Sequence, residues 1–182
     1  ETLTYTNSSS FNNKNVGTGK TVTVDSITLA DGNNGGLASN YSITPGQTTT
    51  ANITAKSLII SGIIASSKTY NGSTSATLDT SAILYSGLIP GDIFDGSYTG
   101  AFSNANVGTA KTVTITSSYT GGDVSNYSIT NQTSTTADIS AKALTATASA
   151  SNKTYNATNY ASVTLTLSGL VGSETLGSTN TS

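Results

Sequence analysis

The chain contains no cysteine, histidine, methionine or tryptophan, and lysine is its only basic residue. Without cysteine there are no disulfides, thiolate nucleophiles or thiolate metal ligands. Without histidine, the commonest general base and the commonest transition-metal ligand are both missing. These absences argue against a conventional hydrolase, and we expect that the chain is not an enzyme.

Charge is also scarce, because only 9% of the residues are charged and the net charge is −2. The chain has no arginine and no basic patch, which argues against nucleic acid and against a membrane surface as partners. The longest apolar run, Leu58–Ala65, is far shorter than the roughly 20 residues that cross a bilayer. We therefore expect no membrane insertion and read this run as a strand.

The most informative feature that is present is a long internal repeat. Asn40-Tyr41-Ser42-Ile43-Thr44 returns as Asn126-Tyr127-Ser128-Ile129-Thr130, 86 positions later. Three other segments recur in the same order: 11–22 as 102–113, 50–56 as 136–142, and 68–71 as 153–156. Glu1-Thr2-Leu3 also recurs as Glu174-Thr175-Leu176, which favours a fragment of a longer array. Such repetition is typical of modules in series rather than of a single active site.

Alternating threonine and aliphatic residues predict strands with one buried and one exposed face, at 21–24, 112–116 and 163–167. Turn-forming residues separate them at 31–36, 71–72, 90–92 and 121–123. No segment has the apolar spacing of an amphipathic helix. We expect an all-β protein of tandem small Ig-like β-sandwich modules in an extended array, with β-grasp-like modules as the alternative.

The repeat allows two divisions of the chain. The first places the boundary at the recurring Ala-Lys pair, so that 57–142 is a complete unit, 1–56 the C-terminal part of a preceding unit and 143–182 the N-terminal part of a following one. The alternative gives units at 1–91 and 92–173 with a tail at 174–182. We favour the first, because the strands on either side of the Ala-Lys pair follow each other without glycine or proline.

The core of each unit is expected at the aliphatic and tyrosine positions that recur between copies. These pairs are Val16/Val107, Val22/Val113, Val24/Ile115, Tyr41/Tyr127, Ile43/Ile129, Ile53/Ile139, Leu58/Leu144, Tyr70/Tyr155 and Leu88/Leu170.

The order of these motifs resembles the YDG-type repeat of bacterial surface proteins. The resemblance is carried by Lys-Thr-Tyr-Asn-Gly at 68–72, Ser-Gly-Leu-Ile-Pro-Gly-Asp at 86–92, Asn-Val-Gly-Thr-Ala-Lys-Thr-Val at 106–113, Asn-Tyr-Ser-Ile-Thr at 126–130 and Thr-Ala-Asp-Ile-Ser-Ala-Lys at 136–142. It implies a stalk module of a large secreted, filamentous-haemagglutinin-like adhesin, located outside the cell or on the bacterial surface. The family's Tyr-Asp-Gly reads Tyr70-Asn71-Gly72 here and Tyr155-Asn156-Ala157 in the next copy. Alanine at 157 indicates that this turn does not need a positive φ.

No residue is predicted to be catalytic, cofactor-binding or metal-binding, although two groups of residues allow an alternative interpretation. The recurring pairs Lys20/Lys111, Lys56/Lys142 and Lys68/Lys153 could form Lys-Asn isopeptide bonds, although lysine at edges and junctions also explains them. The turns Asp31–Asn34 and Asp92–Gly96 offer oxygen ligands for Ca²⁺, but they match no EF-hand loop, and Asx turns explain them more simply. No cofactor is therefore expected, with Ca²⁺ at inter-unit turns as the minor alternative.

The expected partners are the neighbouring repeat units of the same chain. The leading function is a structural stalk or spacer that projects a distal binding domain, and the alternative is a glycan- or surface-binding adhesive module. In that alternative the loops at 31–36 and 92–96, or a tyrosine expected to be exposed, such as Tyr5, Tyr98, Tyr119 or Tyr160, would contact host or environmental glycans. Asn-x-Ser/Thr triplets, which allow glycosylation, begin at Asn7, Asn40, Asn52, Asn71, Asn126, Asn131, Asn152, Asn156 and Asn180.

Overall fold

A computed structural model describes residues 1–176 of the chain, which form strands of 2 to 15 residues and two single turns of 3₁₀ helix. No α-helix occurs in that range, so the all-β expectation is confirmed, and neither 3₁₀ turn could span a membrane. The elements are β1 Leu3–Phe11, β2 Gly17–Asp31, η1 Ala38–Asn40, β3 Thr48–Ile53, β4 Lys56–Ser61, β5 Ile64–Ala65, β6 Lys68–Thr69, β7 Ser75–Ala76, β8 Leu78–Asp79, β9 Leu84–Ser86, β10 Asp95–Phe102, β11 Gly108–Thr120, η2 Val124–Asn126, β12 Tyr127–Thr130, β13 Ser134–Ser140, β14 Thr145–Ala150 and β15 Val163–Ser168.

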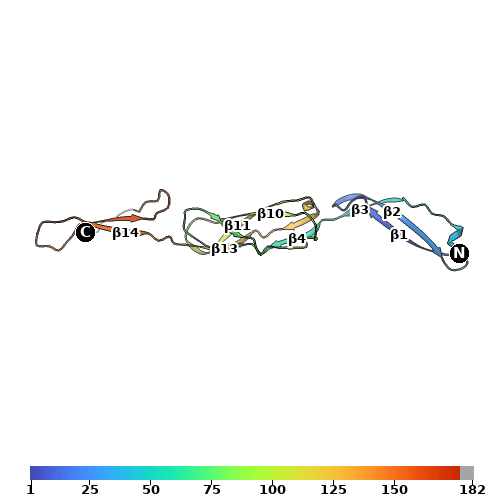
Figure 1. The fold of residues 1–182 in the computed structure, drawn as a ribbon, viewed down its shortest axis with the longest axis horizontal. Coiled ribbons are helices and arrows are strands. Elements are labelled where there is room, and N and C mark those ends of the chain that lie inside the picture. The colour runs from blue at the N-terminus through green and yellow to red at the C-terminus, as the bar shows by residue number, and fades with distance from the viewer. Residues whose placement is uncertain (177–182) are drawn as a thin grey trace. The chain divides into compact units, whose positions relative to one another are not determined.

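The strands form five small sheets with the orders β1-β2-β3, β6-β13-β11-β10-β7, β12-β4-β9, β14-β15 and β5-β8. Figure 1 shows β10, β11 and β13 side by side, as are β1, β2 and β3. By contacts the chain divides into two compact units, each made of three separate segments. The first comprises 1–60, 85–96 and 119–130, and the second comprises 61–84, 97–118 and 131–182.

The repeat seen in the sequence is reproduced in the strand register. In the first copy, Val22 lies opposite Thr49 and Gly17 opposite Ile53. In the second, Val113 lies opposite Thr135, and the register of β11 and β13 matches that of β2 and β3 position by position. Both ladders also shift register at the same place, between Gly17 and Lys20 and between Gly108 and Lys111. The two copies therefore build the same arrangement of three strands, which is the whole sheet β1-β2-β3 in the first copy and the central strands β10, β11 and β13 of the five-stranded sheet in the second.

The core of the second unit lies on one face of the five-stranded sheet. Threonine alternates with aliphatic residues along β11, so Val113 is fully buried while Thr112 and Thr114 are exposed. The residues buried together with it are Ala65, Phe102, Ala137 and Ile139, and Tyr70, Ala76 and Leu78 pack against them. In the first unit Leu58, Ile60 and Tyr127 are buried. The alternating pattern thus predicts the buried face correctly for β11.

The apolar run at 58–65 is a strand, as expected, but glycine divides it. β4 ends at Ser61 and β5 begins at Ile64, with Gly62 between them at φ 89°. A Cβ on Gly62 would lie 2.3 Å from the carbonyl oxygen of Ala82. The run breaks here because the backbone needs both a positive φ and a close approach that only glycine permits.

Several positions expected in the core are exposed. These are Tyr41, Ile43, Val107, Leu144 and Tyr155, together with the expected inner face of β15. Their counterparts Tyr127, Leu58 and Tyr70 in the complete copy are buried or half-buried. The expectation was wrong at Tyr41, Ile43, Leu144 and Tyr155 because the strands that cover their counterparts are not paired with them here. Val107 lies in the complete copy, in the loop just before β11, and is exposed there.

Candidate functional site: the junction between repeats

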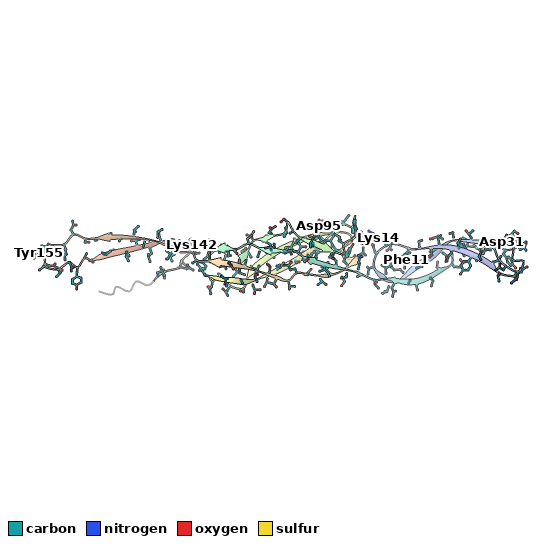
Figure 2. The ribbon with its side chains drawn as sticks, turned by 90° about the horizontal axis from the view of Figure 1, so that it is seen from below. Phe11, Lys14, Asp31, Asp95, Lys142 and Tyr155 are labelled. Carbon is teal, nitrogen blue, oxygen red and sulfur yellow. The ribbon has the colours of Figure 1, made fainter. Side chains whose placement is uncertain are left out.

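A polar cluster in the first compact unit joins one copy of the repeat to the next. Lys14 lies in the loop between β1 and β2 and is labelled in Figure 2. Its Nζ lies 2.8 Å from Oδ1 of Asp123 and 3.2 Å from Oδ1 of Asp92. Both aspartates belong to the second copy. The backbone N–H of Asp92 donates to the carbonyl oxygen of Ile89 and closes a turn, and Asp123 directly precedes η2. One lysine of the first copy therefore bridges two carboxylates of the second.

Amide groups beside Lys14 strengthen this junction. The backbone N–H of Val16 donates to Oδ1 of Asn126 at 2.9 Å. The side-chain amide of Asn126 donates to Oδ1 of Asn15 at 3.3 Å. Three consecutive residues of the first copy thus contact three polar side chains of the second, in addition to the covalent connection between β3 and β4.

Each aspartate is held in place by groups of its own copy. Asp123 accepts a hydrogen bond from the backbone N–H of Ile93 at 3.0 Å. Asp92 accepts one from the Tyr127 hydroxyl at 2.6 Å, and that hydroxyl accepts one from the N–H of Ile89 at 3.0 Å. The two carboxylates are largely shielded from water, whereas the lysine is mostly exposed. The acceptor side of the junction is therefore pre-arranged before the lysine contacts it.

An aromatic cluster supports the tyrosine. The ring of Phe94 lies 6.2 Å from that of Tyr127, 5.6 Å from Tyr85 and 5.2 Å from Tyr119, measured between centroids. The Tyr127 and Tyr85 contacts are edge-to-face, a favourable arrangement for aromatic pairs. Packing of this kind fixes the position of the hydroxyl that binds Asp92.

The electrostatics of the cluster follow from these contacts. The hydrogen bond from Lys14 lowers the pKa of Asp123 below its ordinary value, with the Ile93 N–H acting in the same direction. The hydrogen bonds to Asp123 and Asp92 raise the pKa of Lys14. Burial, followed by the hydrogen bond to Asp92, raises the pKa of Tyr127. The ion pair and the neutral phenol are therefore the preferred states at neutral pH.

The position between Asp92 and Asp123, where a cation could bind, holds the Lys14 ammonium. Asp31, from the other turn weighed for Ca²⁺, accepts a hydrogen bond from the N–H of Ala38 at 2.7 Å. Asp95, labelled in Figure 2, begins β10 and is exposed. In the described part of the chain no three acidic side chains cluster closely enough to hold a metal ion.

Four of the six recurring lysines, Lys20, Lys111, Lys68 and Lys153, lie beside an asparagine no more than seven residues away. Lys111 Nζ donates to Asn104 at 2.7 Å, and Lys20 contacts Asn13 in the same way. Lys68 donates to Asn71 at 3.0 Å and to two backbone carbonyls, and stands 5.2 Å from the Phe102 ring centroid. None of these lysines has a carboxylate among its hydrogen-bond partners in residues 1–176. Each pair therefore closes a loop without the acidic group that isopeptide formation needs.

A second contact joins the complete copy to the third, inside the second compact unit. The Tyr70 hydroxyl donates to the carboxylate of Glu174, and this hydrogen bond raises the pKa of Tyr70. The contact borders a shallow depression of about 160 Å³. That volume is below the range of ordinary small-molecule pockets. Its lining residues are Tyr70, Lys142, Leu144, Gly169, Leu170, Val171 and Glu174.

The residues weighed for glycan contact differ in exposure. Tyr5 and Tyr160 are exposed, whereas Tyr98 and Tyr119 are half-buried, and Tyr119 packs on Phe94. The expectation that all four tyrosines are exposed was therefore wrong for two of them. Among the Asn-x-Ser/Thr triplets, Asn126 is half-buried in the junction, and Asn180 lies outside the described residues.

Lys14 was missed by reasoning from the sequence. It is the one lysine of seven that does not recur, because Ala105 occupies its place in the second copy. Recurrence therefore drew attention away from it. The available signal was a lone lysine in a loop, with two aspartates of the next copy beside turns.

A family model described as the YDG domain matches residues 1–51 and 54–137, which is more than half of the chain. Searches among curated proteins and among solved structures found no match. The matched ranges include every residue of the Lys14 junction. Of the recurring segments, they leave out 52–53, 138–142, 153–156 and 174–176. The chain therefore belongs to the YDG domain family.

Proposed function

We propose that the chain is a structural spacer of a bacterial cell-surface adhesin, in which tandem sandwich-like YDG modules project a distal binding domain outside the cell. The observation that carries this proposal is the Lys14–Asp92–Asp123 bridge, because it joins consecutive repeats by side-chain contacts as well as by the chain. Only Thr54 and Ala55 separate β3 from β4 at the same junction. A short connection with a second contact beside it resists bending.

The composition supports the same role. Serine, threonine and asparagine cover the exposed faces of the strands, and few charges are present. Neighbouring repeats are the partners of this function, and neither a cofactor nor a catalytic group takes part in it. Serial copies add length without adding a new site.

Small-angle scattering on arrays of two, four and six repeats tests the proposal. We expect a maximum dimension that grows nearly in proportion to the number of repeats. Replacing Lys14 with alanine in the repeats that carry it should make the arrays more flexible. A dimension that grows only as the square root of the repeat number contradicts the spacer function.

A glycan array tests the adhesive alternative, in which exposed tyrosines such as Tyr5 and Tyr160 contact sugars. Reproducible binding that free sugar competes away, and that Tyr5→Ala or Tyr160→Ala abolishes, would replace the spacer with an adhesive module. The spacer function predicts no such binding.

A further inference from the structure

Two asparagines of the chain, Asn34 and Asn71, are followed by glycine. Glycine has no Cβ, so the backbone nitrogen after the asparagine is open to close approach by the asparagine side chain. Both asparagines are exposed to water. They differ in the groups that contact their side-chain oxygens, and this difference gives them different chemistry.

The side-chain oxygen of Asn71 accepts two hydrogen bonds. The Lys68 ammonium donates to Oδ1 at 3.0 Å, and the backbone N–H of Ser73 donates to it at 3.1 Å. Lys68 is itself held in place, because Nζ also donates to the carbonyl oxygens of Ser73 and Ser75 at 2.6 and 2.9 Å. Its ammonium also stands 5.2 Å from the centroid of the Phe102 ring. A cation and an amide N–H therefore contact one carbonyl oxygen from fixed positions.

Two donors on a carbonyl oxygen stabilise the negative charge that develops there when a nucleophile attacks the carbonyl carbon. The next nitrogen along the chain is the backbone nitrogen of Gly72. Among residues 1–176 no acceptor is found for its N–H, so no hydrogen bond has to break before it reacts. Gly72 is at φ 74°, and its lack of a side chain keeps this nitrogen accessible.

We propose that Asn71 is a site of spontaneous deamidation, in which Lys68 and the N–H of Ser73 stabilise the oxyanion. The nitrogen of Gly72 gives its proton to water and bonds to Cγ of Asn71, while the electron pair of the C=O bond moves onto Oδ1. The pair then returns, the bond between Cγ and Nδ2 breaks, and ammonia leaves with a proton from water. A succinimide ring remains. Water opens this ring at Cγ to give aspartate, or at the backbone carbonyl to give isoaspartate.

The aspartate product keeps the loop and changes its charge. Its carboxylate replaces the amide, so Lys68 gains an anionic partner and the N–H of Ser73 keeps its acceptor. The segment then reads Tyr-Asp-Gly, the three residues that the name of the family abbreviates. The isoaspartate product instead adds a methylene group to the backbone and moves the carboxylate away from the two donors. This modification goes beyond the spacer function and does not depend on it.

Asn34 is a comparison site in the same molecule that has the glycine without the donors. It precedes Gly35 in an exposed turn. In the part of the chain that the structure describes, no group donates to its side-chain oxygen. Its rate of deamidation therefore reports the effect of glycine alone.

Asn156 is the opposite comparison, with the donors but without the glycine. Lys153 Nζ donates to its Oδ1 at 3.1 Å, and the backbone N–H of Thr158 donates to it at 3.3 Å. The next residue is Ala157, whose Cβ hinders approach of the backbone nitrogen. Of these three asparagines, Asn71 alone combines the glycine with the donors.

Peptide mass spectrometry of the full chain, incubated at neutral pH, measures deamidation at each asparagine as a gain of about 1 Da. In the folded chain we expect Asn71 to react about threefold faster than Asn34, or more. The chain unfolded in urea is the control, because both sites then lose their fixed contacts and should react at similar rates. A ratio of the Asn71 rate to the Asn34 rate that is no higher in the folded chain than in urea overturns the proposal.

Lys68→Met tests the ammonium, because methionine keeps an unbranched stem beside Phe102 and removes the charge. The rate at Asn71 should fall about threefold or more, which is less than the roughly 100-fold effect of a donor in a water-excluded site. The rate at Asn34 should not change. Lys56→Ala, at an exposed lysine, is the matched control and should leave both rates unaltered. An equal or higher rate at Asn71 in Lys68→Met overturns the role of the lysine.

Ala157→Gly tests the same chemistry in a loop that is fully exposed, where a substitution disturbs no core. Glycine suits the φ of 59° at this position. We expect Asn156 to deamidate in this variant at a rate approaching that of Asn71, and adding Lys153→Met should remove most of the gain. If Asn156 reacts no faster in Ala157→Gly than in the wild type, or if Lys153→Met has no effect on the gain, the proposal is overturned.

Discussion

The ammonium group of Lys14 lies 2.8 Å from the carboxylate of Asp123, which belongs to the next copy of the repeat. Asp92 stands at 3.2 Å from the same ammonium. Two shielded carboxylates of one copy are therefore neutralised by a lysine of another. This arrangement makes the junction between repeats sensitive to one side chain and to pH.

We predict that Lys14→Ala raises the pKa of Asp123 towards its ordinary value. The hydrogen bond from Lys14 is the largest cause of the present lowering, and its loss also leaves Asp123 beside Asp92 without a cation between them. Carboxyl chemical shifts followed through an acid titration measure this pKa. Lys56→Ala, at an exposed lysine, is the control and should leave Asp123 unchanged. An unaltered pKa in the Lys14 variant contradicts the assignment.

The stability of the first unit should fall in acid. Because the folded-state pKa of Asp123 lies below its ordinary 3.8, its contribution is present above pH 3.8 and is lost as the pH falls through the lowered value. Thermal unfolding followed against pH should show this loss, and the loss should be smaller in Lys14→Ala. The N–H of Ser81 lowers the pKa of Asp79 in the second unit. The loss of stability in acid that Asp79 causes should therefore remain in the Lys14→Ala variant.

A second loss of stability is expected in alkali. The pKa of Lys14 is raised above 10.5, so its contribution is complete below that pH and is lost as the pH rises through the raised value. The raised pKa of Tyr127 acts in the same direction from pH 10.0 upwards. The alkaline loss should therefore shrink only in part when Lys14 is replaced. An alkaline loss identical in Lys14→Ala and the wild type would exclude Lys14 from it.

Val113→Ala should lower the free energy of unfolding by roughly 2 kcal/mol or more, because it leaves a space in a fully buried site. Urea denaturation measures this value. Val22→Ala changes the counterpart of Val113 in the first copy, which is only half-buried, and should cost less. Thr112→Ala, on the exposed face of the same strand, should change the stability by about 0.5 kcal/mol or less. Equal costs for the two valines would contradict the burial difference.

Tyr127→Phe removes the hydroxyl that joins Asp92 to Ile89, and should lower the thermal midpoint of the first unit by a few degrees. Tyr41→Phe is the matched control. Tyr41 occupies the same place in the first copy and its hydroxyl donates to Glu1 at 2.7 Å, but its ring is half exposed. The control should have little effect. A larger fall in the thermal midpoint for Tyr41→Phe than for Tyr127→Phe would contradict the conclusion that Tyr127 is the buried tyrosine of the pair.

Ala110→Gly should stabilise the protein by about 1 kcal/mol, because Ala110 holds φ at 47° in a region that costs alanine roughly 1 to 2 kcal/mol. Gly19 occupies the same place in the first copy at φ 60°. Urea denaturation measures the gain. Ala101→Gly, in strand β10, is the control and should destabilise by about 0.5 to 1 kcal/mol.

The turn at Ala157 differs from the one that the sequence predicted. Its presence in place of glycine indicated a turn without a positive φ, yet its φ is 59°, close to the 74° of Gly72 in the complete copy. The loop conformation is set by its lysine and asparagine rather than by the residue at the turn. A substitution between copies therefore shows what a position tolerates, not what conformation it adopts.

The alternation of threonine with aliphatic residues was sufficient to predict the strands β2, β11 and β15, since period-two patterning is a local property of the chain. The same pattern did not show which strands would be covered. β15 has as clear an alternation as β11, but all its residues are exposed, whereas Val113 in β11 is fully buried. Burial depends on whether a second layer of structure covers the strand, and the sequence of the strand itself does not determine whether that layer is present.

The sequence alone determined the lysine loops. Lys68 donates to Asn71 and to the carbonyls of Ser73 and Ser75. Lys153 makes the same contacts in the next copy, with Asn156 and the carbonyls of Thr158 and Tyr160. The loop is the same although Tyr155 in it is exposed (Figure 2) and its counterpart Tyr70 is not. All of these contacts span seven residues or fewer, so they form wherever the motif occurs.

Only the tertiary structure decided whether the sequence Tyr-Ser-Ile-Thr forms a strand. At 127–130 it is a strand with Tyr127 buried, and at 41–44 the identical residues form none. A strand needs a neighbour to satisfy its backbone groups, and β4 supplies one to the second copy alone. The Lys14 bridge was beyond sequence reasoning for the same reason, because its partners come from another copy of the repeat and meet it only in the folded chain.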